Sequence, residues 1–342
     1  MPTTEEDGSR GPDARVDDEP AADDAFGALG HEARTRILEA MLDRAGGDGP
    51  SRMTFSELFE ATDLETTAGF AYHLDELVGV YLRKVDDEAG DDGDRRTDAG
   101  YEFTYAGRKI ARAIAAGSYT RSVDRPPIEL DDPCPLCATT GGDGTGTLEA
   151  RSRDNVVTVS CRDCERPILE LQFPPSGLAS HGDGLPDAFD RHHRYRVALA
   201  ADGVCPECGG VVDAALDSPP EALADSLPPE LREHVQAELS CGTCGFELRC
   251  PVTLAVLEHP AVISFYDDHG ENVRERPLWN VGAEWTETVL SADPACVRVV
   301  TELDGETLAL YLDGSLRVVD VQRSAPAERS SAVEPTADGT TA

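Results

Sequence analysis

The sequence predicts an α+β protein in which helices and one β-hairpin come first, two cysteine-rich modules follow, and a β-meander ends the folded part. Three observations lead to this prediction. Apolar residues recur at helical spacing up to about residue 122, four Cys-x-x-Cys pairs lie between residues 134 and 244, and Asp-Gly pairs separate alternating stretches after residue 294. The length of 342 residues allows about two domains or several small ones.

The N-terminal pattern is that of three helices, a hairpin and a fourth helix. The first helix, over residues 31–44, places Ile37, Leu38, Met41 and Leu42 on one face. The second begins with a capping box, in which the side chains of an N-cap residue and of the third helical residue bond each other's backbone amides. Thr54 and Glu57 form this predicted capping box. The elements that follow are a helix over 65–79 that buries Phe70, Leu74 and Leu77, strands at 81–85 and 101–106, and a helix over 107–117.

The stretch after the cysteine pairs predicts one helix and three strands. Asp-Gly between alternating strands is a strong hairpin signal. The helix is expected at residues 259–270 and the strands at 295–303, 306–313 and 315–323. We expect this part to form a β-meander.

Pattern and composition divide the chain into six segments, and the two acidic termini are expected to be disordered. The segments are a tail at 1–22, the helical domain at 23–122, the first cysteine module at 123–178, a linker helix and the second module with a helical insert at 179–257, a helix and β-meander at 258–322, and a tail at 323–342.

Acidic residues dominate the composition. The chain has 66 acidic and 30 basic side chains, a net charge of -36, and its only lysines are Lys84 and Lys109. We interpret this as the hydrated surface of a halophilic protein; the alternative is an acidic protein from a cell of ordinary salinity. The electrostatic screening length is about 3 Å in 1 M salt, so the net charge does not exclude binding to DNA there. Affinity from counterion release is also largely lost.

Neither a run of 18 apolar residues nor the hydrophobic core of a signal peptide occurs. We therefore expect a cytoplasmic protein with no membrane partner. In a reducing compartment the ten cysteines indicate metal ligands rather than disulfides.

The four Cys-x-x-Cys pairs form two groups of two. The pairs of the first group are separated by 23 residues, with apolar strands expected at 155–160 and 167–173, and those of the second by 32, which include a helical insert at 218–239. Two such turns direct four thiolates at one centre, which is typical of a closed structural Zn²⁺ site. The predicted ligands of two zinc ions are Cys134, Cys137, Cys161 and Cys164, and Cys205, Cys208, Cys241 and Cys244.

Other reactive side chains are not expected to form a catalytic site. Cys250 and Cys296 are interpreted as buried small hydrophobes, with a redox or ligand-sensing pair as the alternative. His192 and His193 lie on the predicted linker helix and are expected at the surface. A closed sulfur site leaves no position for a reactive water, so we predict that the protein is not an enzyme.

The order of the N-terminal elements is that of a winged helix-turn-helix. The motif "LGHEARTRIL" at its start and "HLDEL" in the third helix resemble the ArsR-type winged-helix transcriptional regulators over residues 26–116. The whole layout resembles the ArsR-like regulators of halophilic archaea that carry a cysteine-rich C-terminal half. The resemblance implies binding to double-stranded DNA, with the third helix in the major groove, and a homodimer formed through the first and last helices.

The predicted DNA contacts lie on the third helix and at the tip of the hairpin. A threonine or tyrosine hydroxyl can bond base edges or phosphates. Candidates are Thr66, Thr67, Tyr72 and His73 on the helix and Arg95 and Arg96 on the hairpin. His73 is equally consistent with a packing role, and solvation alone equally explains the two arginines. The recognition helix carries no lysine or arginine, and no cysteine precedes Cys134, which excludes the family's thiol metal sensor.

The sequence therefore predicts a transcriptional regulator whose winged helix reads promoter DNA. The zinc-stabilised half would sense, dimerise or recruit a protein of the transcription machinery. The alternative is a protein–protein adaptor that uses zinc ribbons and a winged helix that does not read DNA.

Overall fold

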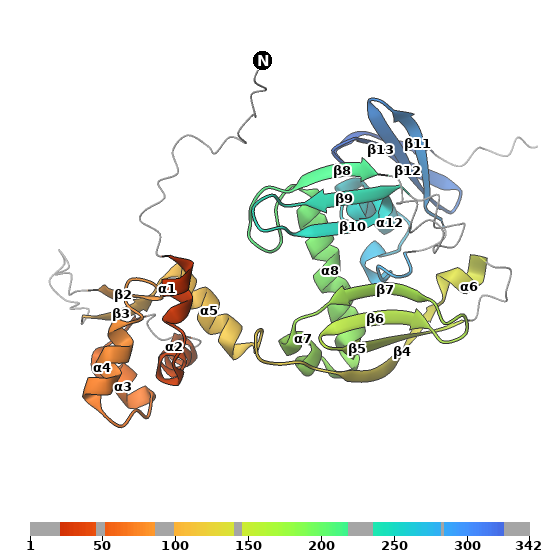
Figure 1. The fold of residues 1–342 in the computed structure, drawn as a ribbon. Coiled ribbons are helices and arrows are strands. Elements are labelled where there is room, and N and C mark those ends of the chain that lie inside the picture. Colours follow the sequence, from red (N-terminus) through yellow and green to blue (C-terminus); the bar gives the residue numbers. More distant parts are fainter. Residues whose placement is uncertain are drawn as a thin grey trace, which may run out of the picture. The chain divides into compact units, whose positions relative to one another are not determined.

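A computed structural model describes residues 21–45, 52–85, 99–139, 146–217, 235–281 and 284–324 (Figure 1). The chain divides into two compact units, Met1–Arg121 and Ser122–Ala342, and the fold is α+β with several antiparallel sheets. Within the described ranges, every helix is too short or too polar to cross a lipid bilayer. Residues 1–20 and 325–342 of the predicted tails, the hairpin tip with Arg95 and Arg96, and most of the helical insert lie outside these ranges. The predicted tail boundaries are wrong by one and two residues, because α1 begins at Ala22 and β14 extends to Ser324.

Unit 1 contains five helices and a three-stranded antiparallel sheet of order β1-β3-β2 within its described residues. The elements are α1 (Ala22–Gly27), α2 (Glu32–Ala45), β1 (Arg52–Met53), α3 (Phe55–Ala61), α4 (Thr67–Asp75), β2 (Leu82–Val85), β3 (Gly100–Phe103) and α5 (Tyr105–Ala115). The second hairpin strand was predicted to reach residue 106, which is wrong. Thr104 ends it because its hydroxyl accepts a hydrogen bond from Gly107 N and begins α5.

The predicted core of unit 1 is confirmed. Ile37, Leu38 and Met41 of α2 are buried against Phe70 and Leu74 of α4 in one cluster, which also contains Leu77. The predicted capping box is confirmed as well. The Thr54 hydroxyl accepts from Glu57 N at 3.3 Å, and Glu57 Oε2 accepts from Thr54 N at 2.8 Å. Such a cap contributes about 1 kcal/mol to a helix.

Unit 2 consists of three antiparallel sheets and the helices between them. The sheets have the orders β4-β5-β6-β7, β10-β9-β8 and β11-β12-β13-β14. Their strands are β4 (Arg125–Pro133), β5 (Thr147–Arg153), β6 (Val156–Cys161), β7 (Pro167–Gln172), β8 (Asp213–Asp217), β9 (Gln236–Ser240), β10 (Glu247–Pro251), β11 (Thr286–Ala292), β12 (Ala295–Leu303), β13 (Glu306–Asp313) and β14 (Val318–Ser324). The helices are α6 (Pro135–Thr139), α7 (Pro175–Ser180), α8 (Leu185–Ala201), α11 (Val252–Val256) and α12 (Pro260–Asp268), with 3₁₀ turns at Gly182–Gly184 and Val273–Glu275.

The predicted C-terminal meander is confirmed, and β11 adds a fourth strand to it. The helical insert was predicted to extend to residue 239, and its last part is wrong. Ala237 and Leu239 are buried while Glu238 between them is exposed, which is the period-two pattern of a strand. Residues 236–240 form β9, which pairs with β8 on one side and with β10 on the other.

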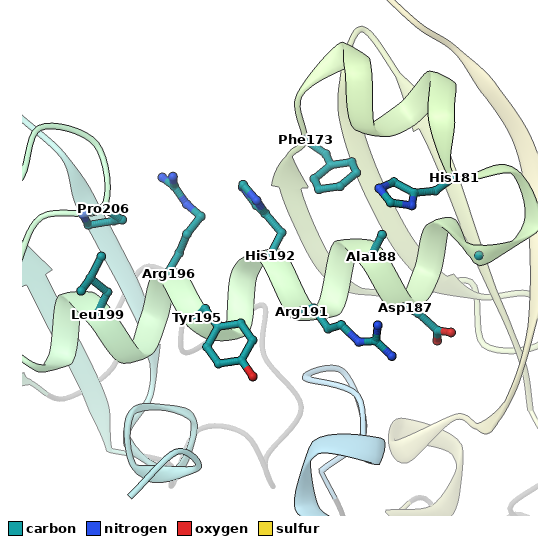
Figure 2. Close-up of a pocket in the computed structure, with 11 residues that line it drawn as sticks. Phe173, His181, Asp187, Ala188, Arg191, His192, Tyr195, Arg196, Leu199 and Pro206 are labelled. Carbon is teal, nitrogen blue, oxygen red and sulfur yellow. The ribbon is translucent and has the colours of Figure 1, made fainter. Parts of the chain in front are cut away.

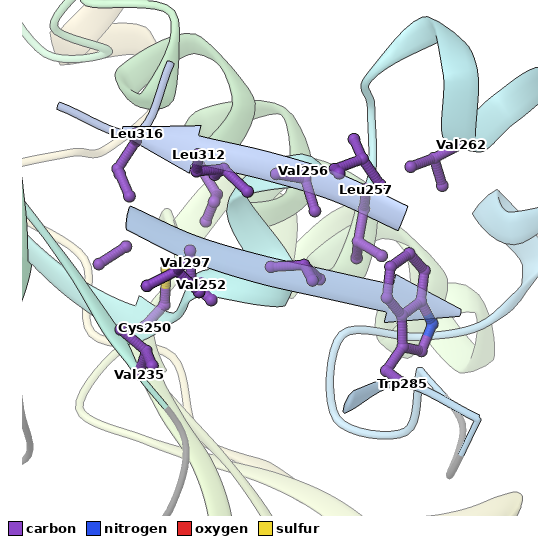
Figure 3. Packing of buried hydrophobic residues seen from close by; sticks show 14 of the residues in the cluster. Val235, Cys250, Val252, Val256, Leu257, Val262, Trp285, Val297, Leu312 and Leu316 are labelled. Carbon is purple, nitrogen blue, oxygen red and sulfur yellow. The ribbon is translucent and has the colours of Figure 1, made fainter. Parts of the chain in front are cut away.

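One hydrophobic cluster joins the second cysteine module to the meander. Val252, Val256 and Leu257 lie against the strands that carry Val297 and Leu312 (Figure 3). A separate cluster fills the first module, where Phe173 and Phe189 pack with their ring centroids 5.7 Å apart. Figure 1 shows the sheets β4–β7 and β8–β10 beside different parts of α8.

Polar residues of α8 are buried, contrary to the prediction of a surface histidine pair. His193 is only 7% exposed and packs against the Phe189 ring at 4.6 Å, while His192 is half-buried. Asp190 and Arg194 are also buried, 3.3 Å apart. Leu278 N donates to Asp190 Oδ1 at 2.6 Å and Arg194 donates to the carbonyl of Arg276, so the pair attaches residues 276–278 to the helix.

Replacing His193 with phenylalanine is expected to reduce the acid sensitivity of unit 2. Burial, with smaller effects of His192 and Arg196, lowers the pKa of His193 from 6.5 to about 4. In this pH range the unfolded chain binds a proton at His193 and the folded protein does not, so the free energy of unfolding falls as the pH drops from about 6.5 to 4. This loss of unfolding free energy is about 3 kcal/mol. Urea unfolding of wild type and His193→Phe at both pH values should show it; equal losses in both proteins would contradict it.

Candidate metal centres

The first cysteine group forms a compact cluster. The sulfur of Cys134 lies 3.9 Å from that of Cys164, and the sulfur of Cys137 lies 3.7 Å from that of Cys161. Cys134 follows β4, and its backbone N–H bonds the carbonyl of Gly146 at 2.9 Å. Cys161 ends β6. The sheet therefore brings together two turns that are distant in sequence.

The second group repeats this geometry. Cys205 and Cys208 lie in the turn after α8, and Cys241 and Cys244 lie in the turn after β9. The sulfurs of Cys205 and Cys244 are 3.6 Å apart, and those of Cys208 and Cys241 are 3.7 Å apart. Each turn closes through a bond from its first cysteine N–H, to Gly210 O in one turn and Phe246 O in the other, both at 2.8 Å. Cys205 and Cys241 are buried, whereas Cys208 and Cys244 are exposed.

Both turns of the second module need a left-handed backbone residue. Gly209 and Gly245 have φ values of 76° and 73° and occupy equivalent positions, four residues after the first cysteine of each turn. Glycine adopts this conformation without steric cost. In the first module Glu165 takes the same position with a φ of 56°.

The thiols of the second cluster have pKa values shifted in opposite directions. Backbone N–H groups of Cys244 and Thr243 lower the pKa of Cys241 to about 6, despite its burial. The pKa of Cys244 is raised to about 12, because burial and thiol neighbours outweigh the Phe246 backbone N–H. Four thiolates cannot coexist so close together unless a positive ion neutralises them. Metal binding releases the remaining protons.

Each cluster can hold one metal ion through four sulfur ligands. All four sulfurs of a group lie within 4.8 Å of one another, as tetrahedral coordination of a single ion requires. The donor set is uniform and closed, with no oxygen or nitrogen ligand among the described residues of either group. Such a centre can crosslink strands.

Gly146 provides the space for the first centre. A Cβ atom at this position would lie 2.6 Å from the sulfur of Cys137 and 2.9 Å from that of Cys161. Sulfur atoms cannot approach carbon so closely, and these sulfurs are fixed by their backbone turns. In the second module Gly242 lies between a cysteine and Thr243, and a Cβ atom there would meet nothing within 4 Å.

Two of the candidate DNA-contacting residues at α4 are exposed, and the other two have contacts within unit 1. Thr67 and Tyr72 are exposed, Tyr72 by 58%. Thr66 is the N-cap, and its hydroxyl accepts from Gly69 N at 3.2 Å. His73 is half-buried, with its ring centroid 4.0 Å from that of His31. Burial and the nearby His31 and Arg34 lower the pKa of His73, so its ring is neutral.

The arginines of the first motif have structural contacts. Arg34 donates to Ala28 O at 3.1 Å and lies 3.5 Å from Glu76, while Arg36 pairs with Glu32 on the helix surface. Both arginines therefore pair with carboxylates of unit 1. Cys250 is buried as predicted, and burial raises its pKa to about 12; Cys296 is only half-buried.

A groove along α8 was missed from the sequence. It has a volume of about 720 Å³ and lies beside the exposed face of the helix (Figure 2). Arg191, Tyr195, Arg196 and Leu199 are among its lining residues. The signal that would have revealed it is a second helical stripe in residues 188–199, on the side of α8 away from Phe189 and Val197.

Gly146→Ala is expected to lower the bound metal from two ions per chain to one, because the new methyl group displaces two ligand sulfurs. Gly242→Ala is the matched control and should keep two. Metal analysis of both purified proteins by mass spectrometry would measure this. Two ions in Gly146→Ala would show that the first cluster tolerates the added carbon.

Comparison with known protein families gives two matches. Residues 22–114 match the family described as Domain of unknown function (DUF7347). Residues 131–318 match the family described as Domain of unknown function (DUF7351). Comparisons with curated proteins and with solved structures found no significant match. The second family match covers more than half of the 342 residues and includes both cysteine clusters, and the chain therefore belongs to the DUF7351 family.

Proposed function

We propose that the protein is a DNA-binding transcriptional regulator, in which unit 1 is a winged helix and two zinc ions stabilise unit 2. The observation that carries this proposal is the exposed start of α4, which follows α3 after a five-residue turn. Its first turn contains no acidic side chain, although acids outnumber bases about two to one in the chain. A helix in this position enters the major groove in helix-turn-helix proteins.

Neutral groups supply the contacts in this proposal. Thr67 and Tyr72 offer exposed hydroxyl groups, and the free N–H groups of Thr67 and Ala68 at the start of α4 favour a phosphate. The exposed Lys84 on β2 adds one cation at the base of the hairpin. At molar salt, ionic contacts with phosphates add little affinity, so hydroxyl and amide contacts bind DNA only slightly less strongly than arginine contacts.

A homodimer would present two such helices. Besides Tyr72, three aromatic side chains in the described part of unit 1 are strongly exposed: Phe26 of α1 by 68%, Tyr105 of α5 by 79%, and Tyr119 just after α5 by 76%. Exposed aromatic residues on the first and last helices favour a protein interface there. Two subunits joined there would contact half-sites about one helical turn apart.

Zinc is the proposed metal of both clusters because four thiolates in tetrahedral arrangement suit Zn²⁺. A closed site has no open coordination position, so the role is structural and the protein is not an enzyme. The stabilised unit 2 then serves to sense, to dimerise or to bind a protein of the transcription machinery.

An adaptor that does not read DNA is the second candidate. It is favoured by the cations of unit 1, most of which have partners within the unit. Arg52 and Arg83 both bond Glu102, at 3.1 Å and 2.7 Å, and Arg44 lies 3.5 Å from Glu57. These arginines are not free to contact phosphates.

Cys134→Ser or Cys205→Ser is expected to remove one zinc ion and unfold part of unit 2, while unit 1 stays folded. Structural zinc contributes roughly 10–16 kcal/mol, comparable to the whole stability of a domain. Zinc analysis and thermal unfolding followed by circular dichroism would measure this. Cys296→Ser is the control, because this cysteine belongs to neither cluster. Simultaneous loss of both units would contradict the expected independence.

Thr67→Asp is expected to abolish promoter binding without lowering stability. The carboxylate would repel phosphates, yet an acidic residue in the first turn of a helix is favourable. Crosslinking in the host followed by sequencing of the bound DNA would measure occupancy. Thr120→Asp, the same change at an exposed position outside α4, should retain the promoter peaks. Peaks that persist in Thr67→Asp would exclude α4 as the reading helix, and a flat wild-type profile would favour the adaptor.

A further inference from the structure

Helix α8 has an exposed stripe besides its buried face. Ala188, His192, Tyr195 and Leu199 recur at intervals of four, three and four residues, so they lie on one side of the helix. Tyr195 is 51% exposed and Leu199 is 42% exposed. Stripes of this spacing normally pack against another element, and no other part of the described chain covers these two side chains.

The stripe forms the floor of the groove of about 720 Å³. Phe173 and His181 form one wall and belong to the first metal module, while Pro206, between two ligand cysteines, belongs to the second (Figure 2). From Ala188 to Leu199 the helix rises about 16 Å, or three turns. The groove is therefore long enough for a helical segment and is bounded by two crosslinked modules.

Arginines flank the stripe on both sides. At 100° per residue, Arg191 and Arg196 lie about 60–80° to either side of the stripe, and Figure 2 shows them projecting from different sides of α8. Arg191 has no ion pair within the described part of the chain. Arg196 pairs with Glu207 and lies 5.6 Å from the Phe246 ring. Asp187 is the single carboxylate among the lining residues, in a chain with 66 acidic side chains.

We propose that this groove binds an amphipathic helix of another protein whose apolar stripe is flanked by acidic residues. Helices recognised in grooves place an apolar stripe on the floor and use flanking charges to select the partner. Arg191 complements an acidic residue on one flank, while Arg196 reaches the other flank only by exchanging its partner Glu207 for a carboxylate of the bound helix. Tyr195 and Leu199 supply the apolar contact. This surface is independent of whether α4 reads DNA.

Charge disfavours two other occupants. A second copy of α8 would bring its own arginines against Arg191 and Arg196, and like charges in such positions repel. A nucleic acid would carry phosphates along the whole groove, past Asp187 in its lining and past Glu207, which pairs with Arg196. A helix with a few acidic residues near the two arginines avoids those carboxylates.

The experiment uses the full chain at the lowest salt concentration at which circular dichroism shows it folded, because the screening length is about 3 Å in 1 M salt and would suppress the charge contribution. Two fluorescent synthetic peptides are compared. Both have the same leucine stripe over 18 residues, one with glutamate flanks and one with lysine flanks. Fluorescence anisotropy should show wild type binding the glutamate peptide at least tenfold more tightly. Leu199→Asp should weaken this binding about tenfold or more, by removing apolar contact. Arg191→Glu should weaken binding of the glutamate peptide and strengthen binding of the lysine peptide. A purely structural effect of the substitution would not produce this exchange.

Arg151→Glu is the matched control, because this exposed arginine of β5 does not line the groove, and it should leave both affinities unchanged. Equal affinities of wild type for the two peptides, or unchanged binding by Leu199→Asp, would overturn the proposal. So would tighter binding of a labelled single-stranded oligonucleotide that Arg191→Glu abolishes. A wild-type dimer that Leu199→Asp converts to a monomer, measured by light scattering, would instead assign the groove to a second copy.

Discussion

The packing of four thiolates around one point is the constraint on which unit 2 depends. Sulfur atoms in each cluster approach one another to less than 4 Å, and the cysteines lie at the ends of strands and turns. The first module has a small core, and the second has a three-stranded sheet. Small modules bury a smaller fraction of their apolar surface than large domains do, and they are correspondingly marginal in stability. A cation bound by the four sulfurs would remove the repulsion between thiolates and join the strands.

A buried charge pair of helix α8 holds the segment before β11. Burial of Asp190 and Arg194 costs several kcal/mol per ion, which hydrogen bonds and opposite charges must offset. Arg194 Nη1 has only the ionic contact with Glu258 at 3.8 Å. Burial raises the pKa of Asp190, while Arg194 and the Leu278 N–H oppose that rise. These bonds hold residues 276–278 against one side of the helix. The opposite side, with Tyr195 and Leu199, is thereby presented on a rigid support, so the groove needs little rearrangement to bind.

The parts of the fold that were predictable are those that depend on local pattern. A Cys-x-x-Cys turn directs both thiols to one side whatever surrounds it, and Asp-Gly between alternating residues specifies the hairpin of β12 and β13. The burial of Asp190 and Arg194 was not predictable, because the backbone groups of residues 276–278 that bond them lie far along the chain. Leu278, for example, is 88 residues from Asp190. Strand β9 was missed because glutamate and alanine, typical of helices, alternate in it.

The acidic surface of the chain and the ion pairs within unit 1 are both compatible with the proposed DNA binding if salt screens the surface. Arg34 is committed to Glu76 and a carbonyl, and Arg52 and Arg83 are committed to Glu102, so the unit uses arginine to stabilise itself. A DNA-binding protein at low salt would lose affinity by doing so, because released counterions supply much of the binding free energy. At molar salt that contribution is small, and backbone amides and hydroxyl groups compete on nearly equal terms. The absence of lysine and arginine from α4 is then no argument against the proposed DNA binding, and specificity would rest on the shape and hydrogen bonds of Thr67 and Tyr72.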